Sequence, residues 1–474
     1  MMPDAGAGLE KQTGVAQDHL DRLAAAAATM SYAAVPALVR ERVRDLVVDT
    51  LAVTAWGSRR DELVALRAVC GHEQPSGSTV LGTPHAHPAA LACSLNGAAA
   101  AADQLQDGHR TARGHPAAHV VLAAFALAEA HDRSTESLLS AVLAGYEVGT
   151  RVGIAMGGTP QGVHDIGTWG TVATAVATTH LLTEGDAAAI ARAIGLAASS
   201  LLLSDAHTIF SGYPGGHAYL GASISHGLWL GQAAAAGLAA APGALERFLG
   251  PHAAARWAGL PPEGPEDSHD YEILRGYIKL HPACAHLHGV LDALDDIRAA
   301  HPDAGVPDDV LRVRVRTYAA ASAFDTPARN ELEARFSIPT AVALSLLHGR
   351  LDDDVLTDEE VASEPVRRLA ARVDVEHAPE LDAGYPAGRP AIVEILLADG
   401  RVLTATSTRP RGDADGDASR EAVRAKPTRL LERAFGPNAE QLLKLLDEWP
   451  DRHTPRELGH HFRQAAGSTA QSDA

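Results

Sequence analysis

Residues 35–55 read VPALVRERVRDLVVDTLAVTA, and this stretch sets the expected fold. Its apolar residues recur with helical spacing, at Leu38, Val39, Val43, Leu46, Val47 and Leu51. Helical patterns separated by Gly and Pro breaks continue along the chain, at 89–102, 117–131, 135–155, 170–183, 186–201 and 223–239. We therefore expect at least six buried helices before residue 250.

The pattern changes after Pro261. Residues 310–318 (VLRVRVRTY) alternate apolar and charged side chains, and 391–406 reads as two short strands joined at a hairpin turn, Ala398-Asp399-Gly400. Residues 338–347 and 357–371 read as helices, the second with a break before Pro365. This region is expected to pack helices on an antiparallel sheet, and a last helical segment follows at 430–448.

The predicted fold class is mainly α, with two domains, because 474 residues exceed what one hydrophobic core normally supports. We place a large all-helical domain at 15–275, completed by residues 420–460, and a smaller α+β domain at 276–410. The polar end of the chain, 461–474, is expected to be a disordered tail.

Composition narrows the classes of partner and compartment. A formal net charge of -19 argues against nucleic acid, and no apolar stretch is long enough to predict a membrane span. Three cysteines (Cys70, Cys93 and Cys284) do not indicate a disulfide framework, so a cytoplasmic location is expected. Neither a GxGxxG after a strand nor a GxxxxGK[ST] motif is present, which leaves nucleotide cofactors without support.

Several motifs carry a family resemblance. GYEVGTRVG stands at 145–153, GVHDIGTWG at 162–170 and KLHPACAHLH at 279–288. Shorter matches follow, at Thr317-Tyr318, 335–339 (RFSIP), 409–413 (RPRGD) and Ala425-Lys426. Together they resemble the MmgE/PrpD family of 2-methylcitrate dehydratase, cis-aconitate decarboxylase and iminodisuccinate epimerase, over about residues 15–450. The resemblance implies a homodimer, no organic cofactor and no metal.

We expect the site at the interface of the two domains, because clefts between domains are common ligand sites. The resemblance adds the residues. It assigns His164 to the active site and makes Lys279 the leading binder of a substrate carboxylate. The family's Asn-Gly, acidic-loop and His-Pro series corresponds here to Asn96-Gly97, Asp103, Asp107, His109 and His115-Pro116.

Proton transfer beside a carboxylate needs a base, an acid and cations that hold the acid groups. Our candidate catalytic residues are His164, His109, His115, Asp107 and Tyr318. Our candidate substrate-binding residues are Lys279, Arg335, Asp103, His217 and Thr168.

Each candidate also has a structural interpretation. His164 can instead satisfy hydrogen bonds within its loop. In the 103–115 loop, Asp103 and Asp107 are expected to orient the histidines. The structural interpretation is that this loop caps the helix that begins at Pro116. Lys279 can be a surface residue at a strand end, as Tyr318 can be a core aromatic. Arg335 can cap the following helix.

The chain departs from the family pattern in two places. The family's dense Leu-Asp-x-Asp-Asp-Thr run is thinned to AADQLQDGH at 101–109. Its T-K-x-x-H-A-G reads PGGHAYLG at 214–221, which puts Gly216 at the lysine position and Tyr219 at the histidine, with His217 as a substitute group. These changes point to a different substrate.

A zinc site is the alternative use of His281, Cys284, His286 and His288, because imidazole and thiolate are the usual zinc ligands. Their spacing matches no standard zinc pattern, so we predict no metal.

Three functions follow from these observations. The first is a lyase that dehydrates or decarboxylates a small di- or tricarboxylic acid. The second is an isomerase or epimerase of the same fold acting in specialised metabolism, and the third is a catalytically silent homologue that only binds a carboxylate.

Overall fold

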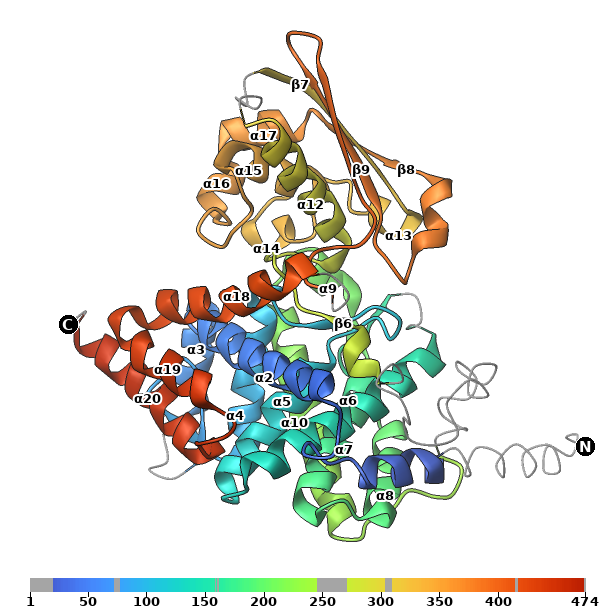
Figure 1. Cartoon of the computed structure of the whole chain (residues 1–474), viewed down its shortest axis with the longest axis vertical. Helices are drawn as coiled ribbons and strands as arrows, with labels where there is room; N and C mark the ends of the chain where they lie inside the picture. Colours follow the sequence, from blue (N-terminus) through green and yellow to red (C-terminus); the bar gives the residue numbers. More distant parts are fainter. Residues whose placement is uncertain are drawn as a thin grey trace, which may run out of the picture.

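The computed structural model describes residues 20–71, 77–157, 159, 162–244, 271–302, 309–413 and 417–472. The chain forms a larger lobe made of helices and a smaller lobe in which helices cover a sheet (Figure 1). The predicted mainly helical fold with a smaller α+β domain is confirmed. The expected start of the first domain at residue 15 and the stretch 245–270 lie outside the described residues.

Most of the large domain comes from the first half of the chain. Its helices are α2 (Ala37–Gly57), α3 (Asp61–Cys70), α4 (Ala89–Ala102), α5 (Pro116–Ala130), α6 (Thr135–Met156), α7 (Trp169–Thr183), α8 (Ala187–Ala198), α9 (Ala206–Phe210) and α10 (Gly215–Ala235). The predicted helices agree within a few residues, except that α10 begins at Gly215 rather than at 223.

Small side chains let the central helices approach closely. A Cβ added to Gly149 of α6 would lie 2.3 Å from the Cβ of Ala173 in α7, and one added to Gly145 would lie 2.6 Å from the carbonyl oxygen of Ala173. Helix α6 is, among the described helices, long and apolar enough to cross a membrane, but 94% of its most apolar stretch is buried. It is the central helix of a packed core.

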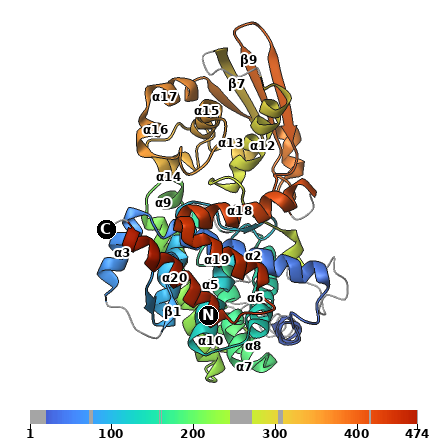
Figure 2. The ribbon, with the colours of Figure 1, turned by 60° about the vertical axis from the view of Figure 1, so that its left-hand side comes forward.

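The last part of the chain returns to the large domain. Helices α18 (Asp417–Phe435), α19 (Ala439–Glu448) and α20 (Pro455–Ser472) follow the small domain, and α18 packs against α2. In both views α18 lies along the border between the lobes (Figures 1 and 2). The predicted disorder of 461–474 is wrong for the part that α20 covers, because Leu458, Phe462 and Ala465 form a helical stripe in the core.

The small domain packs its helices on one face of a four-stranded sheet. Its helices are α12 (Ala285–Ala300), α13 (Ala319–Ser322), α14 (Glu331–Ala334), α15 (Ile338–His348), α16 (Asp358–Ala362) and α17 (Glu364–Ala370). Its strands are β7 (Val310–Thr317), β8 (Val373–His377), β9 (Ala391–Leu397) and β10 (Val402–Ser407), in the order β10-β9-β7-β8. The expected β9–β10 hairpin and the break before Pro365 are both present.

The predicted antiparallel sheet is wrong at one edge. Strand β8 runs parallel to β7, with Val313 opposite Val373 and Val315 opposite Val375. Parallel neighbours need a long crossover connection, and the helices α13 to α17 supply it. The segment VDVEH alternates apolar and acidic side chains, but over only five residues, which is too short to have been recognised as a strand.

The two domains are joined through a buried arginine. Arg335, which is 1% exposed, places Nη2 3.1 Å from Asp103 Oδ1 and donates from Nη1 to the Asp103 carbonyl oxygen. It also contacts the Pro282 carbonyl oxygen and the Asp353 carboxylate. Because Asp103 ends α4 in the large domain, this ion pair fixes the small domain on the large one.

A second buried ion pair attaches the C-terminal segment. Lys426 Nζ in α18 lies 2.8 Å from Asp49 Oδ1 in α2, and it donates to the carbonyl oxygen of Leu105. The two charged side chains are 1% and 0% exposed. Leu105 belongs to the 103–115 loop, so this pair also positions that loop.

We expect the Lys426→Met variant to lose about 3–5 kcal/mol of stability, because it leaves the Asp49 carboxylate buried without a cation. Differential scanning calorimetry should show a lower melting temperature. The double variant Asp49→Leu/Lys426→Met should recover most of the loss, and Lys444→Met, on an exposed lysine, should change little. A single variant that melts like the wild type would show that the pair does not hold α18 to α2.

Candidate active site

The 103–115 loop places His109 in a structural role. His109 is 0% exposed, its Nδ1 accepts a hydrogen bond from the Ala112 N–H, and its Nε2 lies 3.1 Å from Glu272 Oε2. Glu272 precedes the segment that connects the domains and is the carboxylate partner that the sequence analysis missed. The prediction that Asp103 or Asp107 orients this imidazole is therefore wrong.

Asp107 holds the start of α5. Its two carboxylate oxygens accept hydrogen bonds from the N–H groups of Ala117 and Ala118, at 3.0 and 3.1 Å. Burial raises the pKa of Asp107 to about 7, although these two bonds oppose the rise. The helix-capping interpretation describes these contacts, and a catalytic role for Asp107 stays a prediction.

His115 presents one nitrogen of a neutral ring. Its Nδ1 lies 2.6 Å from the carbonyl oxygen of Asp107, and since a carbonyl only accepts, Nδ1 carries the proton and Nε2 is an acceptor. Burial, assisted by the positive charge of Lys279, lowers the pKa of His115 to about 3. Its ring is stacked on that of His164, with 6.5 Å between centroids.

His164 forms an acid/base pair with its neighbour. It lies in the short strand β4 (Val163–His164), which pairs with β5 (Ser204–Asp205), and its Nδ1 is 3.0 Å from Asp165 Oδ1. The Ile166 N–H also approaches Nδ1, at 3.3 Å, but the shorter contact with the carboxylate favours a protonated Nδ1. This tautomer leaves Nε2 of His164 available to a substrate.

The neighbouring imidazoles, His164 above all, keep Asp165 ionised. Burial alone would raise its pKa, but the imidazoles of His164, His115 and His119 together hold the pKa well below its usual value. A carboxylate that stays ionised can orient the imidazole and stabilise its protonated form. Asp165 is 13% exposed and His164 11%, so both lie just below the surface.

The predicted substrate binder Thr168 lies in the same loop and shapes it. Its hydroxyl donates to the carbonyl oxygen of Asp165 at 2.6 Å. Gly167 before it has a φ of 97°, and a Cβ there would lie 2.7 Å from the carbonyl oxygen of Leu202. The loop therefore requires glycine at this position. Direct contact between Thr168 and a substrate stays a prediction.

Lys279 is a buried cation without a protein partner. It follows β6 (Gly276–Tyr277), is 1% exposed, and forms no hydrogen bond or ion pair with the residues that the structure describes. The interpretation as a surface lysine is therefore wrong. Burial lowers its pKa to about 8, with a small contribution from Lys426. An unpaired interior cation is costly, so this position favours a bound anion.

A series of ring contacts joins the two domains around these groups. The His164 ring lies 5.7 Å from Phe210, which lies 5.6 Å from Phe324 of the small domain. Phe324 stacks on His286 at 5.4 Å, and His286 Nδ1 is 2.5 Å from the Tyr318 hydroxyl oxygen. Phe210 ends α9, and α9 faces α14 across the border between the lobes in both views (Figures 1 and 2).

Tyr318 belongs to the small-domain side of this arrangement. It is 1% exposed, and its ring stacks on Tyr385 with 4.7 Å between centroids. Burial raises its pKa, so the hydroxyl keeps its proton at neutral pH. The structure thus combines the two interpretations of Tyr318, because a packed aromatic ring here carries a hydroxyl paired with the His286 imidazole.

Arg335, Asp103 and His217 belong to a separate network. The Arg335 guanidinium is bound by the carboxylates of Asp103 and Asp353. Burial lowers the pKa of His217 to about 4; the charges of Arg60 and Arg335 lower it further, and the charge of Asp103 opposes the change. The substrate-binding roles of these three residues stay predictions, which their present contacts do not support.

The Gly216 position opens onto a small cavity. The cavity has a volume of about 20 Å³ and is lined by Ile166, Ile209, Gly216, His217, Arg335 and Phe336, among others. This space suits a single water molecule. A Cβ on Gly216 would lie 2.7 Å from Cγ1 of Ile209, so a lysine here would require Ile209 to move.

The four residues of the zinc alternative do not meet at one point, although the His281 and His288 rings lie 5.2 Å apart. His281 contacts Asp292, His286 contacts Tyr318, and His288 lies against the Ala283 carbonyl oxygen. Cys284 precedes α12, and burial raises the pKa of its thiol.

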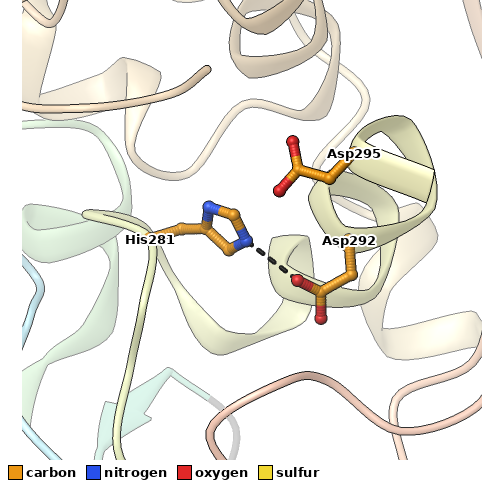
Figure 3. A group of neighbouring side chains, drawn as sticks. All are labelled: His281, Asp292 and Asp295. Carbon is orange, nitrogen blue, oxygen red and sulfur yellow. Dashed lines mark hydrogen bonds and ion pairs between the residues drawn. The ribbon is translucent and has the colours of Figure 1, made fainter. Parts of the chain in front are cut away.

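One compact group with metal-ligand chemistry is His281, Asp292 and Asp295 (Figure 3). His281 Nε2 lies 3.0 Å from Asp292 Oδ1, and this contact raises the pKa of His281 although burial opposes it. The other Asp292 oxygen accepts from the Arg411 N–H, and Asp295 pairs with Arg298 at 2.8 Å. Both carboxylates are thus already bound by donors of the protein itself.

Sequence reasoning missed several residues of this region. Asp165 stands next to His164 between two glycines, and this adjacency was the signal that could have identified it. His286 was considered only as a zinc ligand.

We expect Gly114→Ala to disturb the His164–Asp165 pair and to destabilise the protein by about 1–3 kcal/mol. A Cβ at Gly114 would lie 2.5 Å from Asp165 Oδ2 and 2.4 Å from Cζ2 of Trp169. Thermal melting should show the loss. Gly195→Ala is the matched control, since its added Cβ would meet only Ala240, at 3.8 Å, and should be neutral or stabilising. Equal melting temperatures for the two variants would contradict the close packing at Gly114.

Comparison with known proteins agrees with this architecture. Residues 21–255 match the MmgE/PrpD N-terminal domain, and residues 281–450 match the MmgE/PrpD C-terminal domain. The cis-aconitate decarboxylase-like protein oryM of Aspergillus oryzae is 26% identical over 80% of this chain and 83% of that protein. A cis-aconitate decarboxylase of Aspergillus terreus is 26% identical over 80% of this chain and 82% of its own length. The two domain matches together cover most of the chain, which therefore belongs to the MmgE/PrpD family.

Proposed function

We propose that this protein is a lyase that acts on a small di- or tricarboxylic acid and moves a proton next to one of its carboxylates. The observation that carries the proposal is the combination of the His164–Asp165 pair with the buried, unpaired Lys279. Asp165 is close enough to Lys279 to influence its pKa, which supports the proposal that the acid/base pair and the cation act in one site. Membership in a family with cis-aconitate decarboxylases adds support.

Lys279, His164, Asp165 and His115 each have a separate part in the proposed proton transfer. Lys279 holds a substrate carboxylate, and Nε2 of His164 takes or gives the proton on the adjacent carbon. Asp165 keeps the His164 ring in the required tautomer and stabilises the imidazolium that forms. Negative charge that develops beside the carboxylate is stabilised by Lys279. The neutral His115 accepts a hydrogen bond from a substrate hydroxyl or carboxylic acid.

Two lyase reactions suit these groups. In dehydration, the base removes a proton while an acid protonates the departing hydroxyl, which leaves as water. In decarboxylation, the carbon–carbon bond breaks, carbon dioxide leaves, and the electron pair that remains on carbon takes a proton from the acid. The names of the relatives make decarboxylation of a tricarboxylate the first reaction to test.

The first experiment follows 2-methylcitrate, citrate, cis-aconitate and iminodisuccinate by proton NMR in deuterated buffer with purified, chelator-treated protein. We expect turnover of at least one acid, and a loss of about 10²–10⁴-fold in kcat for His164→Ala, the size typical of a general acid/base. His460→Ala, on an exposed histidine of α20, is the matched control and should retain activity. Unchanged turnover by His164→Ala would exclude its catalytic role.

An isomerase or epimerase is the second candidate function. The observation that favours it is the Tyr318–His286 pair, a second proton-carrying pair that comes from the other domain than His164. An epimerase uses two such groups on one carbon. In the same NMR experiment, uptake of deuterium at the α-carbon without loss of water or carbon dioxide would identify it. Binding of an acid without any of these changes would indicate the silent homologue.

Carboxylate binding should depend on pH through Lys279. Because its pKa is lowered to about 8, the cation is lost as the pH rises through 8, and we expect the affinity for the unreactive tricarballylate to fall. Isothermal titration calorimetry from pH 6.5 to 9.5 measures this decrease, and Lys279→Met should bind weakly with a flat profile. Affinity that is independent of pH across this range would contradict the role of Lys279.

The contribution of Lys279 to the stability of the protein should change with pH in the opposite direction to its contribution to carboxylate binding. The folded pKa of Lys279 lies below the ordinary value of 10.5, so between these values the unfolded chain binds more protons. The contribution of Lys279 to stability therefore rises with pH in that window. The opposite signs separate an effect on ligand binding from an effect on folding.

We also propose that the protein works as a cytoplasmic homodimer without an organic cofactor or metal. Large apolar side chains that remain exposed on the large domain support association with a second copy. They are Leu203, Tyr213, Trp229 and Leu238, at 71%, 57%, 65% and 57% exposure.

A further inference from the structure

Arg389 is a second buried cation that lacks an acidic partner. It precedes β9 in the small domain, is 5% exposed, and forms no ion pair with the described residues. Its guanidinium carbon lies 4.8 Å from the centre of the Tyr277 ring, and its Nε has no hydrogen-bond partner. Stacking on an aromatic ring leaves the edge of a guanidinium, which carries its donors, free for an anion.

Arg113 approaches the same place from the large domain. It belongs to the loop before His115, its φ is 57°, and its guanidinium carbon lies 5.3 Å from the centre of the Tyr385 ring. Tyr385 in turn stacks on Tyr318. Arg113 is exposed, so this second arginine stands at the edge of the site whereas Arg389 lies inside.

Both arginines and Lys279 act on one imidazole. Burial, and then the charges of Arg389, Arg113 and Lys279, lower the pKa of His286 to about 3. The three cations therefore lie near enough to His286 to oppose its protonation. This local excess of positive charge exists in a chain whose formal net charge is -19.

Three other arginines of the small domain form ion pairs even at the surface. On the open face of the sheet, Arg312 pairs with Asp374, Arg314 with Glu376, and Arg316 with Glu380. These exposed arginines have acidic partners even though water would solvate them well. Arg389, which water reaches far less, forms no ion pair with the described residues, because the nearby Asp413 carboxylate pairs with Arg110 at 3.2 Å; its guanidinium therefore keeps donors for a ligand.

We propose that Arg389 and Arg113 bind a second carboxylate of the substrate, while Lys279 binds the first. This inference rests on the proposed function for the place of the first carboxylate. It makes the two arginines specificity-determining residues, because a monocarboxylate would leave the Arg389 guanidinium buried and unpaired. A carboxylate fits better than a single-point donor, since the planar guanidinium edge binds both of its oxygens. The protein therefore selects acids with two or three carboxylates.

Binding of an unreactive series tests this selection directly. Butyrate, glutarate and tricarballylate share a three-carbon chain and carry one, two and three carboxylates. We expect the wild type, measured by isothermal titration calorimetry at pH 7, to bind glutarate and tricarballylate at least about tenfold more tightly than butyrate, the size expected for one charge-assisted contact.

The variants Arg389→Gln and Arg113→Gln should lose most of this preference while their weak binding of butyrate changes less than about twofold. Arg401→Gln is the matched control, since Arg401 lies in the exposed β9–β10 turn and pairs with Asp399. Arg113→Gln keeps the test valid if the buried Arg389→Gln variant fails to fold, because Arg113 is exposed.

Equal losses for all three acids in the variants would overturn the proposal, as would a wild type that binds the three acids alike. Competition by inorganic phosphate as strong as that by glutarate would also overturn it, since the site would then be a general anion site. Selective binding that the variants abolish, together with no turnover of any acid, would uphold this inference and refute the proposed lyase.

Discussion

The buried ion pair between Arg335 and Asp103 is the constraint on which the candidate site depends. His164 and His115 belong to the large domain, whereas His286, Tyr318 and Arg389 belong to the small one. Such groups act on one molecule only if the two domains keep a fixed relation. Arg335 supplies that relation at the point where α4 ends, and its bond to the Pro282 carbonyl oxygen holds the segment that carries Lys279. Separating the two side chains would leave each charge buried without its partner. Because this state is unfavourable, the contact stays formed.

Charges in the interior follow two patterns. Asp49 with Lys426 and Asp103 with Arg335 are closed pairs, whose members neutralise one another and hold segments together. Lys279 and Arg389 are buried cations that form no ion pair with the described residues. The closed pairs hold the fold together. The unpaired cations lower the stability of the folded protein, but they create a buried site that attracts an anion. A chain that is acidic as a whole thus concentrates positive charge in one buried region.

Much of the architecture could be predicted because alanine and leucine recur with helical spacing in the helices that form the core. The failures have physical causes. Strand β8 is short and pairs only at an edge, and α20 buries its stripe at Leu458 and Phe462 within a polar sequence. For the site, His164 followed from its glycine-bounded motif, but the partner of His109 is Glu272, more than 150 positions away. Burial of a charged residue such as Lys279 cannot be derived from local pattern, because it is decided by segments that meet only in the folded protein.

The return of the C-terminal segment to the large domain has a consequence for biosynthesis. Lys426 emerges from the ribosome long after Asp49 and the Leu105 loop, and the whole small domain is made in between. Until α18 arrives, the Asp49 carboxylate lacks its ion-pair partner and the Leu105 carbonyl oxygen lacks its donor. The nascent large domain thus lacks these contacts while the small domain is synthesised, so the bond between Lys426 and the Leu105 loop forms only after the small domain has been made.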